Sequence, residues 1–523
     1  MPLINTAELT PESINRYAGK ELEQIYNGLD CCVTLEVLGE IKRLSNQQHI
    51  IYDFERALQA PALEMMLRGW KVDQYERRKA IDDLKSQVRF LNDRLQRMAK
   101  VWLNEPLTDQ KKKPRTTDWV NPNSGKQLQK LFYGALKVPE VWTYKQGKKS
   151  LSMDRESLEK IAQNYYAGPI CSAILGIREH QKSIDVLETE IDPDGRMRTS
   201  YNIAATETGR WSSSKNAEGT GGNLQNWKER LRRVMVADTG WKIAAIDLEQ
   251  ADAREIGFTM GVLFNDWTYL NACESGDLHT NSAKLVWPEL AWTGDRKADR
   301  ELAEQIFYRD FSFRDMSKRG GHGTTYVGTP FTMARHLKVP VKVMELFQDR
   351  FFSAFPGIPR LHLWTAQELQ TKFKLRTYFG RERHFFGRAN DDATLREAVA
   401  FLGQSPTADR MSRGVYNLWE KLRHRIRLIG QLHDAVYFLY RDDPLEEAEV
   451  LPLALACCEI PVKAPNGRVF IVPGEAKVGW NWSKMHDTGK PIDPKRNQFN
   501  PNGLVKWSPA KPDKRVRLAG EVF

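Results

Sequence analysis

Two aspartates, far apart in the chain, each stand at the end of a short apolar segment. Asp247 closes the segment 243–247, which is typical of a buried strand. Asp434 lies near the turn of a hairpin-like segment, 431–440. An acid at the end of a strand is often only a helix cap, so either residue alone indicates little. On neighbouring strands, the two carboxylates would supply protein ligands for two-metal phosphoryl transfer.

The donor atoms of such a pair favour Mg²⁺. This ion prefers hard oxygen ligands and takes one or two protein carboxylates, while phosphates and water complete its shell. We therefore predict two Mg²⁺ ions as cofactors, with Mn²⁺ as a substitute. The cysteines offer no competing zinc or iron–sulfur site, because none forms a C-x-x-C pair. They also show no disulfide framework, which favours a reducing cytoplasm as the location.

A cationic stripe lies between the two acids. Arg314, Lys318, His322 and Tyr326 recur at every fourth position. On a helix they would form one face about 18 Å long, suited to gripping a triphosphate and stacking against a base. The alternative is an ordinary amphipathic helix with a solvated face. Three glycines in the same segment favour the functional interpretation, since each costs a structural helix roughly 1 kcal/mol; we expect them to allow close approach of substrate, or a bend.

The elements around these residues change character along the chain. Residues 1–45 and 50–190 are predicted to be mainly helical, and a lysine-rich stretch, 111–115, is expected in an exposed loop. Strand-like segments begin near residue 192, at 197–201, 242–247 and 431–440. From residue 488 the chain is rich in Pro and Lys, with eight Lys/Arg against three Asp/Glu, and is predicted to be extended or disordered.

The net charge of the chain is +11, and 15 Trp and 16 Tyr accompany it. This combination fits a protein that binds a polyanion, although solvated lysines on an unrelated protein explain the charge equally well. No apolar run reaches 18 residues, so no membrane partner is expected.

Nine short segments occur in the order typical of one enzyme family. They are 206–213, 223–226, 230–233, 247–254, 277–280, 314–326, 377–381, 404–409 and 431–434. On these motifs the chain resembles the DNA polymerases of family A, the bacterial polymerase I type, over roughly residues 50–485. The resemblance implies a DNA-directed DNA polymerase, with a DNA primer-template and dNTPs as partners. A short chain of this kind suggests a phage-type version.

The resemblance also implies an α+β right-hand fold, a palm sheet with mainly helical fingers and thumb. Its expected parts are a helical remnant of a 3′–5′ exonuclease domain (1–45), a helical thumb (46–190), a first palm segment (191–259), fingers (260–400), a second palm segment (401–487) and the basic tail (488–523).

Site residues follow from the same motifs. The expected catalytic residues are Asp247, Asp434 and Lys318, with the carbonyl of Leu248 as a further metal ligand. The expected nucleotide-binding residues are His279, Arg314, Lys318, His322, Tyr326, Asp252 and Gln250. The expected DNA-binding residues are Arg210, Gln225, Asn226, Arg254, Gln404 and His433.

Three positions depart from the family pattern. Asp252 stands where the family has the glutamate that excludes ribose, so discrimination against ribonucleotides is open. His322 replaces a Phe or Tyr that bears on sugar selectivity. Ala435 replaces an accessory glutamate, for which Glu249 is a candidate substitute.

The first residues resemble only a fragment of a proofreading site. The segment 26–30 is similar to the family's third exonuclease motif, but no D-x-E pair precedes it. We expect no intrinsic proofreading. Residues 1–45 are then either a packing helix or one half of a site that a separate exonuclease or replication protein completes. Three rival functions stay open: a non-catalytic polymerase-like subunit, a nuclease or strand-binding protein of another class, and a single-subunit polymerase with relaxed ribose discrimination.

Overall fold

The computed structural model describes residues 10–44, 50–107, 118–145, 148–216, 218–309, 311–484 and 500–517. The lysine-rich stretch 111–115 lies outside these ranges. The chain forms two compact units, Met1–Arg56 and Ala57–Phe523. Within the first unit, α1 (Pro11–Ile14) begins at a capping box made by Thr10 and Ser13, and α2 (Lys20–Leu44) follows.

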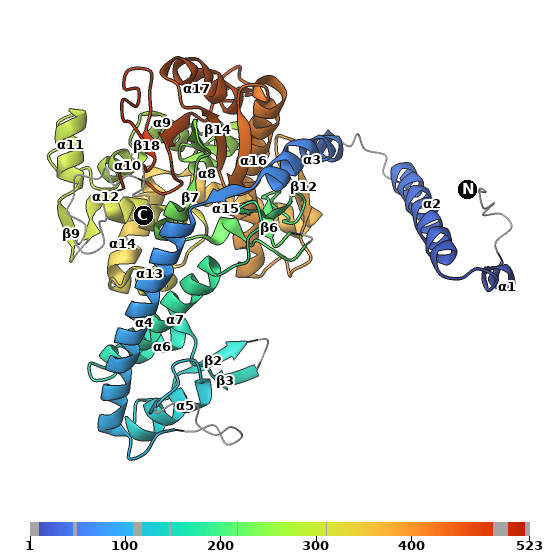
Figure 1. Ribbon diagram of the computed structural model, residues 1–523. Coiled ribbons are helices and arrows are strands. Elements are labelled where there is room, and N and C mark those ends of the chain that lie inside the picture. Colours follow the sequence, from blue (N-terminus) through green and yellow to red (C-terminus); the bar gives the residue numbers. More distant parts are fainter. Residues whose placement is uncertain are drawn as a thin grey trace. The chain divides into compact units, whose positions relative to one another are not determined.

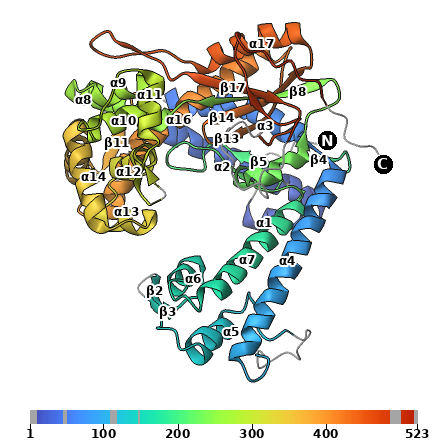
Figure 2. The ribbon, with the colours of Figure 1, turned by 90° about the vertical axis from the view of Figure 1, so that its left-hand side faces the viewer.

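The second unit begins with helices of the expected thumb. α4 and α7 lie side by side as a long pair (Figures 1 and 2). Leu95 and Ala99 of α4 pack against Ile170 and Ile174 of α7, all nearly inaccessible to solvent. The helices of this part are α3 (Ile50–Arg68), α4 (Gln74–Trp102), α5 (Gly125–Gln129), η2 (Lys130–Ala135), α6 (Arg155–Ile161) and α7 (Gly168–Leu187).

The expected thumb is mainly helical, but two of its segments form strands that were not predicted. A hairpin of β2 (Trp142–Lys145) and β3 (Lys148–Leu151) interrupts it. Trp142, Thr143 and Tyr144 of β2 are residue types that favour strands, and the prediction of helices from residue 124 onward did not take this into account. β1 (Trp70–Val72) also leaves the helices and pairs with β4 (Arg196–Met197) and β7 (Met235–Val236). Gly69, with φ of 61°, makes the break between α3 and β1.

The palm sheet is antiparallel throughout, in the order β13-β14-β8-β17-β18. Ile243 and Ala245 of the central strand pack with Trp70, Tyr437 and Trp482 on one face. On the other face α17 (Pro444–Cys458) contacts β8, β14 and β17. The strands are β8 (Trp241–Leu248), β13 (Arg427–Leu432), β14 (Ala435–Arg441), β17 (Gly474–Gly479) and β18 (Val505–Lys506). Two of the predicted strand segments, 242–247 and 431–440, are thereby confirmed.

Smaller pairs of strands accompany this sheet. β5 (Ser200–Asn202) pairs with β6 (Ser212–Ser214), and β15 (Val462–Lys463) pairs with β16 (Val469–Phe470). The third predicted segment, 197–201, divides between β4 and β5. The 3-10 turns η3 (Leu224–Asn226) and η4 (Glu229–Val234) lie between β6 and β7.

The fingers form a helical cluster around buried aromatic residues. Phe347 and Phe351 of α14 and Phe355, the residue that follows this helix, pack in a row inside it. The cluster consists of α9 (Thr268–Glu274), α10 (Leu278–Val286), α11 (Arg296–Ala303), α12 (Phe313–Thr325), α13 (Pro330–Leu337), α14 (Val341–Ala354) and α15 (Gly357–Lys372), with the pairs β9 (Ile306–Tyr308) and β10 (Phe311–Ser312), and β11 (Lys374–Arg376) and β12 (Glu382–His384). α8 (Ala251–Phe264) and α16 (Asp392–Leu422) join this cluster to the palm.

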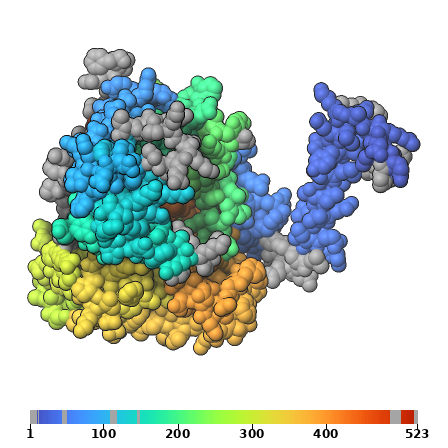
Figure 3. Space-filling model, turned by 90° about the horizontal axis from the view of Figure 1, so that it is seen from below, coloured from blue at the N-terminus to red at the C-terminus, as the bar shows by residue number. Residues whose placement is uncertain are grey.

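Thumb and fingers meet on one face of the second unit. Arg335 of α13 lies 3.9 Å from Glu156 of α6 in an exposed ion pair. In the space-filling view the cyan surface of the thumb borders the yellow surface of the fingers (Figure 3).

The glycines of α12 have a structural reason that differs from the one expected. A Cβ on Gly320 would lie 2.8 Å from the ring of Phe347, and one on Gly321 would lie 3.0 Å from Phe351. The third, Gly323, lies against Met333 in the same way. The expectation of close substrate approach or a bend is therefore corrected: these glycines let α13 and α14 pack tightly against α12.

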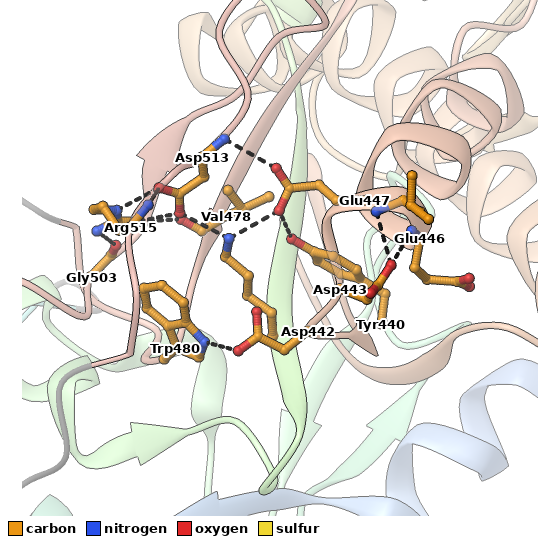
Figure 4. A network of polar contacts seen from close by, with 12 residues as sticks. Tyr440, Asp442, Asp443, Glu446, Glu447, Val478, Trp480, Gly503, Asp513 and Arg515 are labelled. Atoms are coloured by element: carbon orange, nitrogen blue, oxygen red, sulfur yellow. Dashed lines mark hydrogen bonds and ion pairs between the residues drawn. The ribbon is translucent and has the colours of Figure 1, made fainter.

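Of the basic tail, the structure describes residues 500–517, and this part is extended and not disordered. Residues 505–506 form the edge strand β18, which pairs with β17. Asp513 accepts from the buried ammonium of Lys242 at 3.0 Å, and its N–H donates to Glu447 at 3.1 Å. Figure 4 shows Asp513 and Glu447 facing each other, with Arg515 beside Gly503 and Trp480. The Pro and Lys content is typical of a disordered segment, which is why composition suggested disorder as one alternative. The order of this part comes from buried apolar side chains, Leu504 and Trp507, and from the paired Asp513.

Candidate active site

The sheet register brings the two predicted acids together. Asp247 lies near the end of β8, and its cross-strand partner on β14 is Ala435, the residue after Asp434. The N–H of Leu248 donates to the carbonyl of Asp434 at 3.1 Å. His433 turns the chain between β13 and β14 with φ of 56°, in the left-handed region. The tight turn at His433 and the pairing of β8 with β14 therefore hold both carboxylates at the same end of the sheet.

The two carboxylates are costly to ionise without a cation. Burial and the neighbouring charge of Asp247 raise the pKa of Asp434 to about 6. Burial likewise raises the pKa of Asp247, and Lys477 opposes that shift. In the ranges that the structure describes, no three or more His, Cys, Asp or Glu side chains are arranged so that they could hold a metal ion. Two hard carboxylates fit Mg²⁺, which completes its shell from phosphates and water.

The predicted cationic stripe is a helix, as the spacing indicated. Arg314, Lys318 and His322 lie on α12, and Tyr326 caps its end. Arg314 donates twice to Asp277, at 3.2 Å each. Burial and the charges of Arg314 and Lys318 lower the pKa of His279 to about 4. The neutral imidazole and the two cations thus share one region of the fingers.

Asp252 and Tyr326 lie close together, but Asp252 pairs elsewhere. The guanidinium of Arg210 lies 3.2 Å from the Asp252 carboxylate. The hydroxyl of Tyr326 is buried and has no hydrogen-bond partner among the described residues. Burial and the charge of Asp252 raise the pKa of Tyr326 well above its usual value. Arg210, predicted to contact DNA, is therefore held beside the expected sugar position.

Residues expected to contact DNA divide into two groups. Asn226 and His433 are exposed, and Gln404 is half-buried in α16. Gln225 is buried and donates to Gln431 at 3.3 Å, while Gln431 donates to the carbonyl of His433 at 2.6 Å. Hydrogen bonds therefore connect Gln225 of η3, through Gln431, to the turn that holds Asp434.

Arg254 does not fit its expected role. Its side chain is 5% exposed, and it donates to the carbonyl of Cys273 at 3.1 Å. A guanidinium that is buried between α8 and α9 cannot reach a duplex at the surface. The expectation that Arg254 contacts DNA is corrected: it joins α8 to α9.

Gln250 stands at the junction between β8 and α8. Its backbone is left-handed, with φ of 53°, and the buried oxygen of its side chain has no partner within the described part of the chain. A buried amide oxygen without a donor is unusual, so this position is suited to a ligand group.

Two charged residues near Asp247 escaped the sequence analysis. Glu475 is the cross-strand partner of Asp247 on β17. The ammonium of Lys477 lies 3.5 Å from Asp247. The only available signal was the alternation within 474–479, which places both charged side chains on one face of a strand.

A hollow of about 190 Å³ adjoins the two acids. Its wall includes Asp247, Asp434 and three cationic side chains, Arg232, Lys477 and Lys484. Space beside two neighbouring acids, with cationic side chains in the same lining, suits a phosphate group that approaches a metal site.

Residues 92–482 match the family described as DNA polymerase family A. The chain is 26% identical over 485 residues to DNA polymerase I of Chloroflexus aurantiacus, covering 88% of this chain and 46% of that protein. It is also 26% identical over 473 residues to the thermostable DNA polymerase I of Thermus aquaticus, covering 86% and 51%. The chain thus spans about half the length of these relatives.

A solved structure has a similar fold. The POL domain of Pol1 from M. smegmatis, in complex with DNA primer-template and dNTP, matches with a TM-score of 0.64 at 20% identity, covering 82% of this chain and 69% of that one. Among the residues described, no helix is both long and apolar enough to span a bilayer.

Proposed function

This chain belongs to DNA polymerase family A, and we propose that it is a DNA-directed DNA polymerase that adds dNMP to the 3′-hydroxyl of a primer and releases pyrophosphate. The predicted α+β right-hand fold is confirmed by its likeness to a polymerase domain. A DNA primer-template and dNTPs are the proposed partners.

One observation carries the proposal. Asp247 and Asp434 are separated by 187 positions in the sequence (434 minus 247), yet Asp247 lies on β8 and Asp434 lies in the turn that leads into the neighbouring strand β14, at the same end of the palm sheet. Asp247, Asp434 and the carbonyl of Leu248 would hold two divalent ions. When bound, such ions supply activation of the attacking hydroxyl and neutralisation of the leaving pyrophosphate.

The fingers contribute the groups that bind the triphosphate. Lys318 and Arg314 present fixed cations, and the pairing of Arg314 with Asp277 orients its guanidinium. Neutral His279 can donate one hydrogen bond to a phosphate oxygen without adding charge. Cations placed where charge develops stabilise the transition state more than the ground state.

Residues near the turn at His433 would position the primer. Arg210, Gln404 and His433 are proposed to contact the primer terminus and the minor groove, where acceptors are similar for all correct base pairs. Such contacts test the shape of a pair without reading its sequence.

Primer extension tests this function. With a labelled primer-template, Mg²⁺ and four dNTPs, we expect template-directed extension that requires the metal and the template. A purified, folded chain that extends no primer with either Mg²⁺ or Mn²⁺ would refute the proposal and favour a non-catalytic subunit.

We further propose that selection against ribonucleotides is relaxed. Asp252 is one methylene shorter than the family's glutamate, and Arg210 holds it at 3.2 Å. A longer acid at this position would extend further toward a 2′-hydroxyl. The preference for dNTP over rNTP should therefore rise about tenfold in Asp252→Glu, in line with the value of one methylene. An unchanged ratio of the two incorporation efficiencies would count against this.

A further inference from the structure

Strand β17 presents two charged residues on the same face as Asp247. Glu475 pairs with Asp247 across the strands, and Lys477 pairs with Ala245. Paired residues of antiparallel strands, and residues two apart on one strand, point to the same side of a sheet. The side chains of Asp247, Glu475 and Lys477 therefore share the face that lines the hollow.

Their contacts form a chain of alternating charge. The Nζ of Lys477 lies 3.5 Å from Oδ2 of Asp247 and 2.8 Å from Oε1 of Glu475. The other oxygen of Glu475 accepts from Nζ of Lys506 at 2.6 Å. The Lys477 side chain is 20% exposed, so its ammonium is held in place and partly removed from water.

The tail supports this arrangement from the outer edge of the sheet. Lys506 of β18 is the cross-strand partner of Lys477. Arg515 anchors the segment by donating to the carbonyl of Val478 at 3.1 Å and to the carbonyl of Gly503 at 2.9 Å. Lys477 is thus held between two neighbouring strands, β8 and β18.

An ammonium at this place has the same sign of charge as a divalent ion bound to Asp247. It can satisfy one oxygen of that carboxylate when no metal is present. It also repels a metal ion at the same carboxylate, and in a partly buried site this repulsion is weakly screened.

We propose that Lys477 is a positioning residue for Asp247, which holds Oδ2 of the carboxylate in the metal-free enzyme and competes with the divalent ion for it. This inference rests on the proposed function only in treating Asp247 as a metal ligand. Lys477 thereby sets the metal concentration at which the site fills.

Direct metal binding tests the proposal without catalysis. Free Mn²⁺ is followed by electron paramagnetic resonance during titration of the full chain, with neither DNA nor dNTP. We expect Lys477→Met to bind Mn²⁺ with a Kd about fivefold lower than wild type, because a nearby like charge is removed. Lys477→Arg keeps the charge and should restore the wild-type Kd to within about twofold.

Two further variants separate contact from general charge. Lys506→Met removes the same charge one strand away, without contact to Asp247, and should change the Kd less than twofold. Glu475→Gln frees Lys477 for Asp247 and should raise the Kd. A purely structural role for Lys477 would weaken or leave unchanged Mn²⁺ binding in Lys477→Met, and either result would overturn the proposal.

The result is distinguishable from failure of the proposed function. Inability of wild type to extend a primer, together with the predicted order of Mn²⁺ affinities, would refute only the polymerase assignment. Normal extension with equal Mn²⁺ affinity in wild type and Lys477→Met would refute only the role of Lys477. Asp247→Asn should weaken Mn²⁺ binding, and an Mn²⁺ affinity equal to that of wild type would overturn the proposal.

Discussion

Two acids of the second unit differ in their surroundings: Glu255 in α8 is fully buried, and Asp434, in the turn between β13 and β14 of the palm, is partly buried. Burial raises the pKa of both. Glu255 is fully buried, but Arg410 donates to it at 2.9 Å and the hydroxyl of Tyr378 donates at 2.7 Å. Asp434 has Asp247 as its neighbour, a like charge that raises its pKa further.

The difference separates structure from function. A buried charge with a complete set of partners joins elements together, and here it ties α8 to α16 and to the segment before β12. A partly buried acid beside another acid is costly to ionise until a cation arrives, which is typical of a working site. Substitutions at the two places should therefore have opposite effects on activity and stability.

The largest effect is expected from Asp247→Asn and Asp434→Asn. Each should lower the rate of single-nucleotide incorporation by about a thousandfold or more, because the metal ligands are lost. Primer-template affinity should stay near that of wild type. Rapid-quench kinetics measure the rate, and Asp53→Asn, at an exposed position of α3, is the control. Near-normal incorporation by either palm variant would break the comparison.

The converse variant is Arg410→Met. Removing one partner leaves Glu255 as an uncompensated buried charge, so the free energy of unfolding should fall by about 3–5 kcal/mol. Chemical denaturation measures it. Arg155→Met breaks an exposed pair with Glu159 and should cost less than about 1 kcal/mol. Equal losses in the two variants would mean that burial does not govern the contribution of the pair.

Lys318→Met sharpens the comparison within the fingers. Lys318 is proposed to meet the triphosphate where charge develops, so its loss should slow incorporation about a hundredfold while duplex affinity changes little. Fluorescence anisotropy gives the duplex Kd, and Lys342→Met, exposed on α14, is the matched control. A variant that loses DNA binding but keeps its single-turnover rate would contradict this role.

The sequence predicted the elements that local patterns specify, and it missed what depends on the pairing of distant strands. The acids Asp247 and Asp434 and the helix from Arg314 could be predicted, because each stands in a short, recognisable pattern. Lys477 reaches the same site only through the register of β17 against β8, and no local pattern specifies that register. For this reason the sequence of β17 did not indicate that Lys477 belongs to the site.

The wrong assignments of two sets of residues have the same cause, which is contact between elements that are distant in the sequence. The glycines of α12 and the guanidinium of Arg254 were assigned to ligands, but both are used in packing between helices. Motif positions are shared by residues that touch substrate and by residues that support them. Arg381 and Asp409, from two of the nine segments, illustrate this: they pair with each other at 2.7 Å.

A pH series tests the free-energy cost of ionising Asp434, which has another acid, Asp247, as its neighbour. The pKa of Asp434 is about 6, above its ordinary value of 3.8, so the folded state binds a proton that the unfolded state releases between these values. Stability should therefore fall as pH rises through this window. In the presence of EDTA, Asp434→Asn should melt at a higher temperature than wild type at pH 7.5 and at a similar one at pH 4. A difference that is independent of pH would contradict the assigned cause.

The smallest effect is expected in the first unit, from Asp30→Ala. Asp30 is exposed on α2, and no cluster of three potential metal ligands occurs around it in the described residues. A two-metal nuclease needs several carboxylates that share its ions, and one exposed acid cannot hold both. A primer with a mismatched 3′ end, incubated with Mg²⁺ and no dNTPs, should therefore stay intact for hours with wild type and with Asp30→Ala alike. Adding a separate protein that carries a D-x-E half-site should shorten the primer only if Asp30 is retained. Shortening by wild-type chain alone, lost in Asp30→Ala, would show that this acid already works with partners, and the contrast between the paired acids of the palm and the single acid of α2 would fail.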